Sequence, residues 1–129
     1  MTHHPVTSPD VAATGGPFAP AVRAAPGELL FISGQVALGP DGSLVGVGDA
    51  GAQAAQCLRT VEALLRAAGG GPGAVVRVVV YLTDIADRAA VAEARCAYFG
   101  DHRPAATLVE VKGLVHPDLV VEIEATAVL

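Results

Sequence analysis

The stretch VVRVVVYL at Val75–Leu82 decides the fold class of this chain. It consists mainly of valine, and β-branched residues favour strands. It follows a Gly- and Pro-rich loop at residues 69–73 and lies between two segments with helical periodicity. Because helices lie between strands in a chain whose ends resemble hairpins, we expect an α+β fold with two helices on one face of a mixed sheet. The other, largely apolar face is then free to pack against a neighbouring subunit.

The two flanking segments have the 3.6-residue periodicity of amphipathic helices. The first extends from Asp49, a suitable N-cap, to Gly69, and its predicted buried face consists of Leu58, Val61, Leu65 and Ala68. The second follows Asp87 and ends at Gly100, and its predicted buried face consists of Val91, Ala94 and Tyr98. These helices contain both cysteines, Cys57 and Cys96, which we expect to be buried thiols without a disulfide or a metal.

Further strands are predicted towards both ends of the chain. An apolar run at residues 29–32 begins one strand, and the turn residues 39–42 lead into another at 43–47. Pro104 delays the next strand to residues 106–112, and the last is expected at 119–128. Residues 21–23 favour a short edge strand. We expect residues 1–15 to form an irregular N-terminal segment and residues 16–129 to form a single domain.

Composition and charge narrow the class of protein. The length of 129 residues fits one domain, and 13 acidic against 8 basic residues give a net charge of −5. Only 16% of the residues are charged and 52% are hydrophobic, which leaves few charges to cover the surface. Because large exposed apolar patches are uncommon on monomers, this composition predicts a homo-oligomer.

Several classes of partner are disfavoured. The eight basic residues form no run, which argues against a nucleic-acid partner. The most apolar stretch is too short to span a membrane, and the first ten residues lack the pattern of a signal peptide, so we expect a cytoplasmic protein. The four histidines lack the spacing of zinc ligands, so no metal is expected.

Two carboxylates stand on one face of the last predicted strand. Side chains alternate along a strand, so Glu122 and Glu124 face one side while Val121 and Ile123 face the other. Residues two apart lie roughly 6.6 Å from each other, close enough for two acids to couple in dry surroundings. A solvent-facing edge is the simpler interpretation of this pattern, because charged residues on a half-exposed strand are ordinary.

The chain also resembles a known family. Its motifs follow one another in the family's order, namely Gly16-Pro17-Phe18, Phe31-Ile32-Ser33-Gly34-Gln35, Val80-Tyr81-Leu82-Thr83-Asp84, Arg103-Pro104-Ala105 and Val121-Glu122-Ile123-Glu124-Ala125. These are similar to the signatures of the Rid family of reactive intermediate deaminases, also called YjgF. The resemblance implies a chorismate-mutase-like α+β subunit, a homotrimer, and three clefts at the subunit interfaces.

The resemblance also implies a chemistry. Typical members hydrolyse 2-imino acids to 2-oxo acids and ammonia without a cofactor. An arginine clamps the substrate carboxylate and a glutamate positions the attacking water. Glu122 matches that glutamate and is the expected catalytic residue, whereas Glu124 is expected to be structural. Ser33 and Gly34 match positions of the cleft near the ligand.

Departures from the family pattern fall at the same cleft. The family's Arg-Pro-Ala-Arg-Ser-Cys is here Arg-Pro-Ala-Ala-Thr-Leu, so Ala106 replaces the clamping arginine, Thr107 a serine and Leu108 a cysteine. Alanine cannot replace a bidentate guanidinium contact. Phe18 stands where a tyrosine is usual. Arg88 stands at a usual aromatic position and offers a substitute clamp, although an exposed arginine in the first helical turn is the simpler interpretation.

These residues give two hypotheses of different classes. The first is a trimeric Rid-type enzyme that acts on an imine, an enamine or a related small carbonyl compound, with Glu122 as base or water-positioning residue and Phe18, Ser33, Gly34, Arg88, Ala106, Thr107 and Leu108 lining the cleft. The second is a non-catalytic trimer that binds a small metabolite or a protein partner, because fold alone does not fix function.

Overall fold

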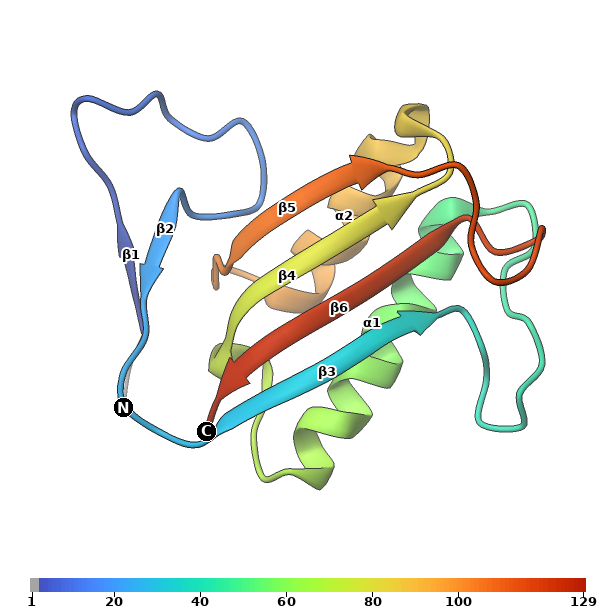
Figure 1. Cartoon of the computed structure of the whole chain (residues 1–129), viewed down its shortest axis with the longest axis horizontal. Coiled ribbons are helices and arrows are strands. Elements are labelled where there is room, and N and C mark those ends of the chain that lie inside the picture. The colour runs from blue at the N-terminus through green and yellow to red at the C-terminus, as the bar shows by residue number, and fades with distance from the viewer. Residues whose placement is uncertain (1–2) are drawn as a thin grey trace.

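The computed structural model describes residues 3–129 and places two helices on one face of a four-stranded sheet, with a two-stranded ribbon beside it (Figure 1). The strands are β1 (His4–Val6), β2 (Ala21–Arg23), β3 (Leu29–Val36), β4 (Val75–Leu82), β5 (Ala105–Glu110) and β6 (Val121–Val128). The helices are α1 (Ala50–Ala67) and α2 (Arg88–Phe99), and the short 3-10 turns η1 (Pro72–Ala74) and η2 (Ile85–Asp87) precede β4 and α2. The α+β fold expected from the sequence is confirmed.

The large sheet is mixed, as its sequence predicts. Its strand order is β3-β6-β4-β5. Strand β6 is antiparallel to both β3 and β4, while β4 and β5 are parallel neighbours. A parallel pair requires a crossover connection, and α2 provides it. The register places Ala106 beside Val78 and Glu122 beside Tyr81.

The core lies between the helices and one face of this sheet. Along β6, Val121, Ile123, Ala125 and Ala127 are buried, whereas Glu122, Glu124 and Thr126 are half-buried on the opposite face. Helix α1 contributes Leu58, Val61 and Leu65, as its periodicity predicts, but Ala68 is exposed because it lies beyond the last full turn at the C-cap. The sheet therefore has a helix-covered face and a face that the chain leaves open (Figure 1).

The two helices begin in different ways. The Asp49 side chain accepts a hydrogen bond of 3.0 Å from the backbone N–H of Ala52, so it caps α1 as predicted. Asp87 precedes α2 as predicted, but its side chain makes no capping bond. Instead, Asp84 accepts from the backbone N–H of Ala86 at 2.9 Å, because the turn η2 extends the helix start by three residues.

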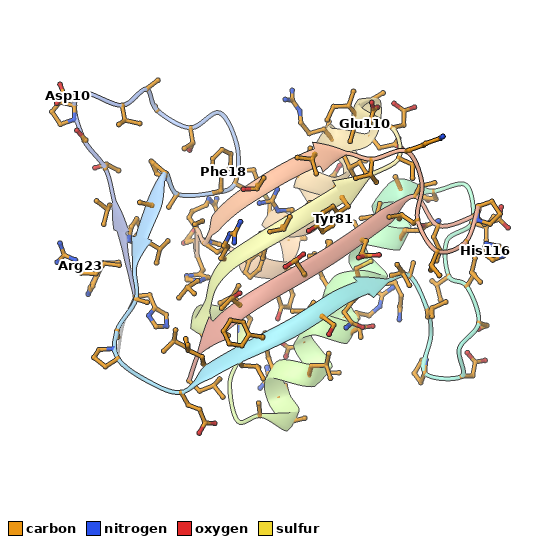
Figure 2. All side chains as sticks on the ribbon, viewed as in Figure 1. Asp10, Phe18, Arg23, Tyr81, Glu110 and His116 are labelled. Carbon is orange, nitrogen blue, oxygen red and sulfur yellow. The ribbon has the colours of Figure 1, made fainter. Side chains whose placement is uncertain are left out.

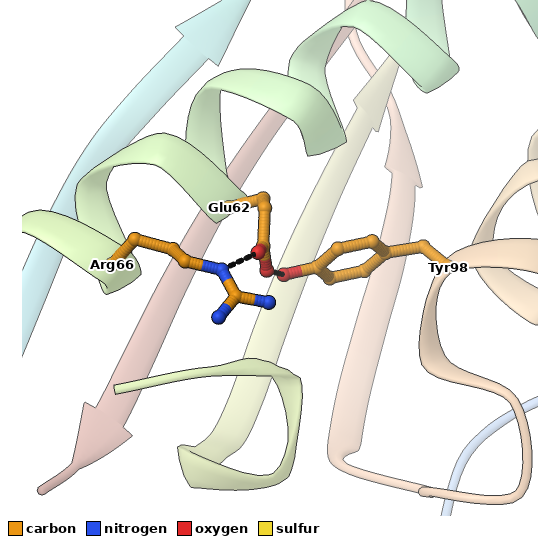
Figure 3. A network of polar contacts seen from close by, with 3 residues as sticks. All are labelled: Glu62, Arg66 and Tyr98. Atoms are coloured by element: carbon orange, nitrogen blue, oxygen red, sulfur yellow. Dashed lines mark hydrogen bonds and ion pairs between the residues drawn. The ribbon is translucent and has the colours of Figure 1, made fainter. Parts of the chain in front are cut away.

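Polar side chains fasten the two helices to each other. The hydroxyl of Tyr98 on α2 donates a hydrogen bond of 2.7 Å to Glu62 on α1, and Arg66 forms an ion pair with the same carboxylate (Figure 3). Burial, together with this hydrogen bond, raises the pKa of Tyr98. The hydrogen bond from Tyr98 is also the main cause of the lowered pKa of Glu62.

One predicted strand is absent. Residues 43–47 form no strand, although an isolated antiparallel bridge joins Leu38 to Leu44 and the N–H of Val45 donates to the carbonyl of Ala37 at 2.9 Å. The turn before them is present, with the N–H of Gly42 donating to Gly39 at 2.9 Å. Gly46 has φ of +74°, a left-handed conformation that interrupts an extended run, so this short pairing does not continue into a strand. The prediction of a strand at residues 43–47 was wrong.

The buried face of α2 differs from the predicted one. Val91, Arg95 and Phe99 are buried, while Ala94 and Tyr98 are half-buried at the margin. Cys96 follows Arg95 by one residue, which turns its side chain about 100° away, and it is exposed. The prediction of two buried thiols is therefore correct for Cys57 alone. Burial raises the pKa of the Cys57 thiol to about 12.

The N-terminal part forms a ribbon outside the main sheet. Strand β2 occupies the predicted residues, but its antiparallel partner is β1 and not an edge of the large sheet (Figure 1). The segment before Gly16, expected to be irregular, thus contains one short strand. Among the described residues, no helix has both the length and the apolar character that crossing a membrane requires.

Candidate functional site

A hollow of about 700 Å³ lies between α2, strand β5 and the loop before β2. The loop contributes residues 15–18, α2 contributes one stripe of its surface, and β5 contributes Ala106 and Leu108. Ala106 pairs with the core residue Val78, so both β5 residues face the helix side of the sheet. The volume is in the range usual for small-molecule sites.

Backbone contacts bring Phe18 to this hollow. Ala19 forms a parallel bridge with Ala105 at the start of β5, and its N–H donates to the carbonyl of Pro104 at 3.1 Å. The Thr14 hydroxyl donates to the carbonyl of Phe18 at 2.9 Å and holds the loop. Figure 2 shows Phe18 beside the beginning of β5. A segment distant in sequence thus closes one wall of the hollow.

Two arginines from α2 line the opposite wall. Arg88 is exposed at the first turn, and Arg95, which is only 3% exposed, lies seven residues later. Seven residues are nearly two helical turns, so both side chains lie on one side of α2. Sequence reasoning identified Arg88 and missed Arg95. The available signal was the spacing of Val91 and Phe99, because Arg95 lies midway between these two apolar positions.

Glu122 lies on the open face of the sheet, against Gly34 of β3. A Cβ atom at position 34 would come within 2.2 Å of Oε2 of Glu122, so a side chain there would push the carboxylate out of its present position. The pairing of β3 with β6 is irregular between Ile32 and Gln35, and such bulges are frequent beside active sites. The Glu122 carboxylate accepts no hydrogen bond from another residue within 3–129, and it is half-buried.

Glu124 has a different environment. The hydroxyl of Tyr81 on β4 donates a hydrogen bond of 2.5 Å to its carboxylate. This hydrogen bond is the main cause of the raised pKa of Tyr81. Of the two carboxylates on this face, Glu124 is held by a neighbour, whereas Glu122 keeps its oxygens free for another group.

The chain divides the predicted site residues into two groups. Phe18, Arg88, Ala106 and Leu108 come together at the hollow, to which the structure adds Arg95. Gly34 of β3 lies against Glu122 of β6, Ser33 is exposed and precedes Gly34 in the same strand, and Thr107 is exposed on the open side of β5. The hollow is on the helix side of the sheet and Glu122 is on the other side, so one chain does not join the two groups.

Metal-binding clusters are not found in the described part of the chain. No group of three His, Cys, Asp or Glu side chains within residues 3–129 is arranged to hold a metal ion. His102 instead contacts the carbonyl of Val75 at 2.6 Å, and His3 contacts the backbone N–H of Ala25 at 2.9 Å. The charged side chains at the two groups are the carboxylate of Glu122 and the guanidinium groups of Arg88 and Arg95.

Known proteins share this architecture. The sequence model of the family described as Endoribonuclease L-PSP matches residues 9–129. A RutC family protein of Pyrococcus horikoshii is 40% identical over 112 residues, which cover 87% of this chain and 86% of the relative. The 3-aminoacrylate deaminase RutC of Acinetobacter baylyi is 37% identical over 111 residues and covers 86% of both chains. The crystal structure of the Rid family protein YyfB from Yersinia pestis covers both chains completely, with a TM-score of 0.91 and 35% identity.

The Rid family protein YyfB thus shares with this chain the layer of two helices on a mixed sheet. The chain belongs to the Rid (YjgF) family, as its motifs indicate. Membership supports a small-molecule deaminase-like or related role.

Proposed function

We propose that this protein is a cofactor-independent Rid-type enzyme that acts on an imine, an enamine or a related small carbonyl compound. Glu122 is its base or water-positioning residue, and the cleft lies between subunits. Family membership supports this proposal, as does the relative in Acinetobacter baylyi that is named a 3-aminoacrylate deaminase. The hollow beside α2 has the size of a small-molecule site.

The contact between Glu122 and Gly34 is the observation that carries the proposal. A carboxylate on a solvent-facing edge does not require a neighbour without a side chain, yet here any Cβ at position 34 would overlap Oε2. The carboxylate is half-buried and is not used by Tyr81, which donates to Glu124. A half-buried acceptor that no neighbouring side chain uses can hold a water molecule or take its proton.

A second copy of the chain is needed to complete this site. Glu122 and the hollow lie on opposite sides of the sheet, so they meet only if subunits place one chain's open face beside another chain's hollow. The open face also carries Phe31, which is 73% exposed, and Leu29. Apolar side chains of this size favour burial against a partner. The proposed assembly is the homotrimer of the family, and light scattering that finds a stable monomer would overturn the shared cleft.

The proposed hydrolysis needs only water. As water attacks the carbon of the C=N bond, Glu122 accepts one water proton, and the nitrogen gains a proton to give a carbinolamine. Glu122 first passes the water proton on to this nitrogen. It then accepts the hydroxyl proton of the carbinolamine and gives it to the nitrogen as the C–N bond breaks, which leaves a C=O group and ammonia. An enamine enters the same sequence after protonation at carbon converts it to the imine. The carboxylate is regenerated, so no redox partner is consumed.

Turnover of freshly generated imines tests this function. Loss of 2-iminopropionate, 2-iminobutyrate and 3-aminoacrylate can be followed by trapping with semicarbazide. Glu122→Gln is expected to lower turnover of the accepted substrate by about 100-fold or more while the assembly stays intact. Glu124→Gln, on the same strand and face, is the matched control and is expected to retain most turnover. Unchanged turnover in Glu122→Gln would remove the assignment.

The alternative is a non-catalytic trimer that binds a small metabolite or a protein partner. One observation favours it: the residues that line the hollow include no carboxylate, hydroxyl, thiol or imidazole that could transfer a proton. A binding module would tolerate Glu122→Gln and respond to a larger side chain at Ala106. An enzyme would respond to both changes.

Ala106→Arg serves as a further probe, because it restores the clamping residue of the family pattern. Activity gained in this variant would indicate that the cleft is intact and that its natural substrate is a different compound.

A further inference from the structure

Arg95 carries a positive charge that nothing in the described chain neutralises. Its side chain is 3% exposed, and its Nε and Nη2 atoms are buried without a hydrogen-bond partner among residues 3–129. Burial lowers the pKa of Arg95, yet a guanidinium remains protonated in proteins. Buried charges are normally paired, because removing an ion from water is costly. An unpaired guanidinium at this depth therefore requires a binding partner.

The partnerless atoms have the geometry of an oxyanion contact. Nε and Nη2 lie on the same edge of the planar guanidinium, and such an edge donates two parallel hydrogen bonds to a carboxylate or a phosphate. Neighbouring atoms cover this edge, and Arg95 lines the hollow. An oxyanion contact therefore requires the side chain to rotate so that this edge turns towards the hollow. A single acceptor such as a backbone carbonyl would accept a hydrogen bond from only one of these two donors.

The surroundings favour an anion. Arg88 lines the same hollow two turns earlier on α2, and no Asp or Glu is among the lining residues. Ala89 and Ala92 separate the two arginines on the wall, and their small side chains leave space between them. The one ion pair found within the described residues joins Glu62 to Arg66 and involves neither of these arginines. Two cations in one hollow reinforce each other's attraction for a negative group.

We propose that Arg95, assisted by Arg88, forms an oxyanion subsite in the hollow, which holds the carboxylate or phosphate group of the small-molecule ligand. The anion is thus anchored from helix α2, while position 106 on β5 contributes only the space that an alanine leaves. This inference rests on the proposed function, since it assigns a charged substrate class to that site. It differs from the proposal for Glu122, because it concerns binding and does not require turnover.

Calorimetric titration tests the subsite apart from catalysis. The probes are 2-oxobutyrate for a carboxylate, inorganic phosphate for a phosphate, and butanone as the uncharged counterpart of 2-oxobutyrate. Each is titrated into the full chain carrying Glu122→Gln, so that no turnover contributes heat. We expect one of the two anions to bind at least tenfold more tightly than butanone, and the preferred anion identifies the group that the ligand carries.

Three substitutions locate the contact. Arg95→Met is expected to weaken binding of the anion about tenfold or more, Arg95→Lys to recover part of the loss, and Arg88→Met to have a smaller effect. Arg23→Met removes the same charge from an exposed strand outside the hollow and is the matched control. Two results would overturn the proposal. The first is equal affinity for 2-oxobutyrate and butanone together with no phosphate binding, and the second is unchanged anion affinity in Arg95→Met.

Thermal unfolding provides a second readout that a purely structural arginine would not give. Added anion should raise the unfolding temperature of the parent protein and leave that of Arg95→Met unchanged. Without anion, Arg95→Met should unfold at the same or a higher temperature, because methionine fills the space without a buried charge. If Arg95→Met instead dissociates the assembly, a carboxylate of a neighbouring subunit is the partner of Arg95, and the oxyanion subsite is excluded. Turnover that is unchanged in Glu122→Gln, with anion binding intact, would contradict the proposed function alone.

Discussion

The two faces of the four-stranded sheet are built differently. On the helix face, residues of β4 and β6 are almost completely buried under α1 and α2, and Tyr98 and Glu62 fasten the helices to each other. On the open face, Phe31 and Leu29 are exposed and Glu122 keeps its oxygens free. The helix face therefore stabilises the chain, and the open face is available for assembly and chemistry.

The two faces should respond in opposite ways to the same substitution. Leu82 on β4 is fully buried, so Leu82→Ala leaves a cavity and should lower the free energy of unfolding by about 2–5 kcal/mol. Leu29 on β3 is 58% exposed, so Leu29→Ala should change the stability of the chain by about 0.5 kcal/mol or less. Urea unfolding followed by circular dichroism measures both.

Self-association completes this first test. If the open face contacts another subunit, Leu29→Ala should weaken assembly in sedimentation experiments although the fold is retained. Equal losses of unfolding free energy in the two variants would show that the open face belongs to the core of the chain, and the comparison of the faces would fail.

A methyl group at position 34, on the open face, should lower turnover strongly while it changes the free energy of unfolding little. Gly34→Ala places a Cβ where Oε2 of Glu122 lies, so the carboxylate must move. Displacement of a reacting group by about 1 Å can cost about 100-fold in rate, and we expect a loss of turnover of this size. The cost in stability should remain below the ~1–3 kcal/mol of overpacking in a rigid core, because the end of the glutamate side chain can swing away.

The control for this variant is Gly113→Ala. A Cβ at position 113 would meet no atom within 4 Å, so its turnover should equal that of the parent. Normal turnover in Gly34→Ala, measured beside this control, would mean that the position of the Glu122 carboxylate does not matter to the reaction.

The sequence predicts the elements that depend on local patterns. The valine-rich strand β4, helix α1 with its Asp49 cap, and the alternation along β6 are all confirmed, because burial repeats with the period of the element itself. The strand expected at residues 43–47 fails for a local reason too, since Gly46 takes a left-handed conformation. A glycine leaves that conformation open without requiring it.

The candidate site was harder to predict, because it depends on contacts between distant segments. The family resemblance marked Glu122 and Gly34, but their contact depends on the irregular pairing of β3 with β6. Arg95 was missed, since a charged residue in an amphipathic helix is expected to face solvent. Its burial follows from the phase of α2, which Val91 and Phe99 set against the sheet. The joining of Glu122 to the hollow across a subunit boundary stays a prediction.

The smallest expected effect compares two tyrosines that each donate to a glutamate, one on each face. Tyr98 joins α2 to α1, so Tyr98→Phe should lower the free energy of unfolding at pH 7 by about 1 kcal/mol. Tyr81 donates to Glu124 on the open face, where water can replace the lost partner, so Tyr81→Phe should change stability less. Equal losses in the two variants would contradict this difference between the faces.

The pH dependence of stability gives a further test of the hydrogen bond between Tyr98 and Glu62. The pKa of Tyr98 is raised in the folded chain by burial and by Glu62, so the folded state keeps this proton after the unfolded chain has lost it. Its contribution is therefore complete below the ordinary tyrosine pKa of about 10 and is lost as pH rises through the folded value. The lowered pKa of Glu62 acts in the other direction, and its contribution is present above its ordinary value of 4.5 and is lost as pH falls.

Tyr98→Phe removes the main cause of the Glu62 shift, so urea unfolding of this variant should depend less on pH at both the acidic and the alkaline end than that of the parent. A variant with the parent's pH dependence would show that the helices are held together without this hydrogen bond.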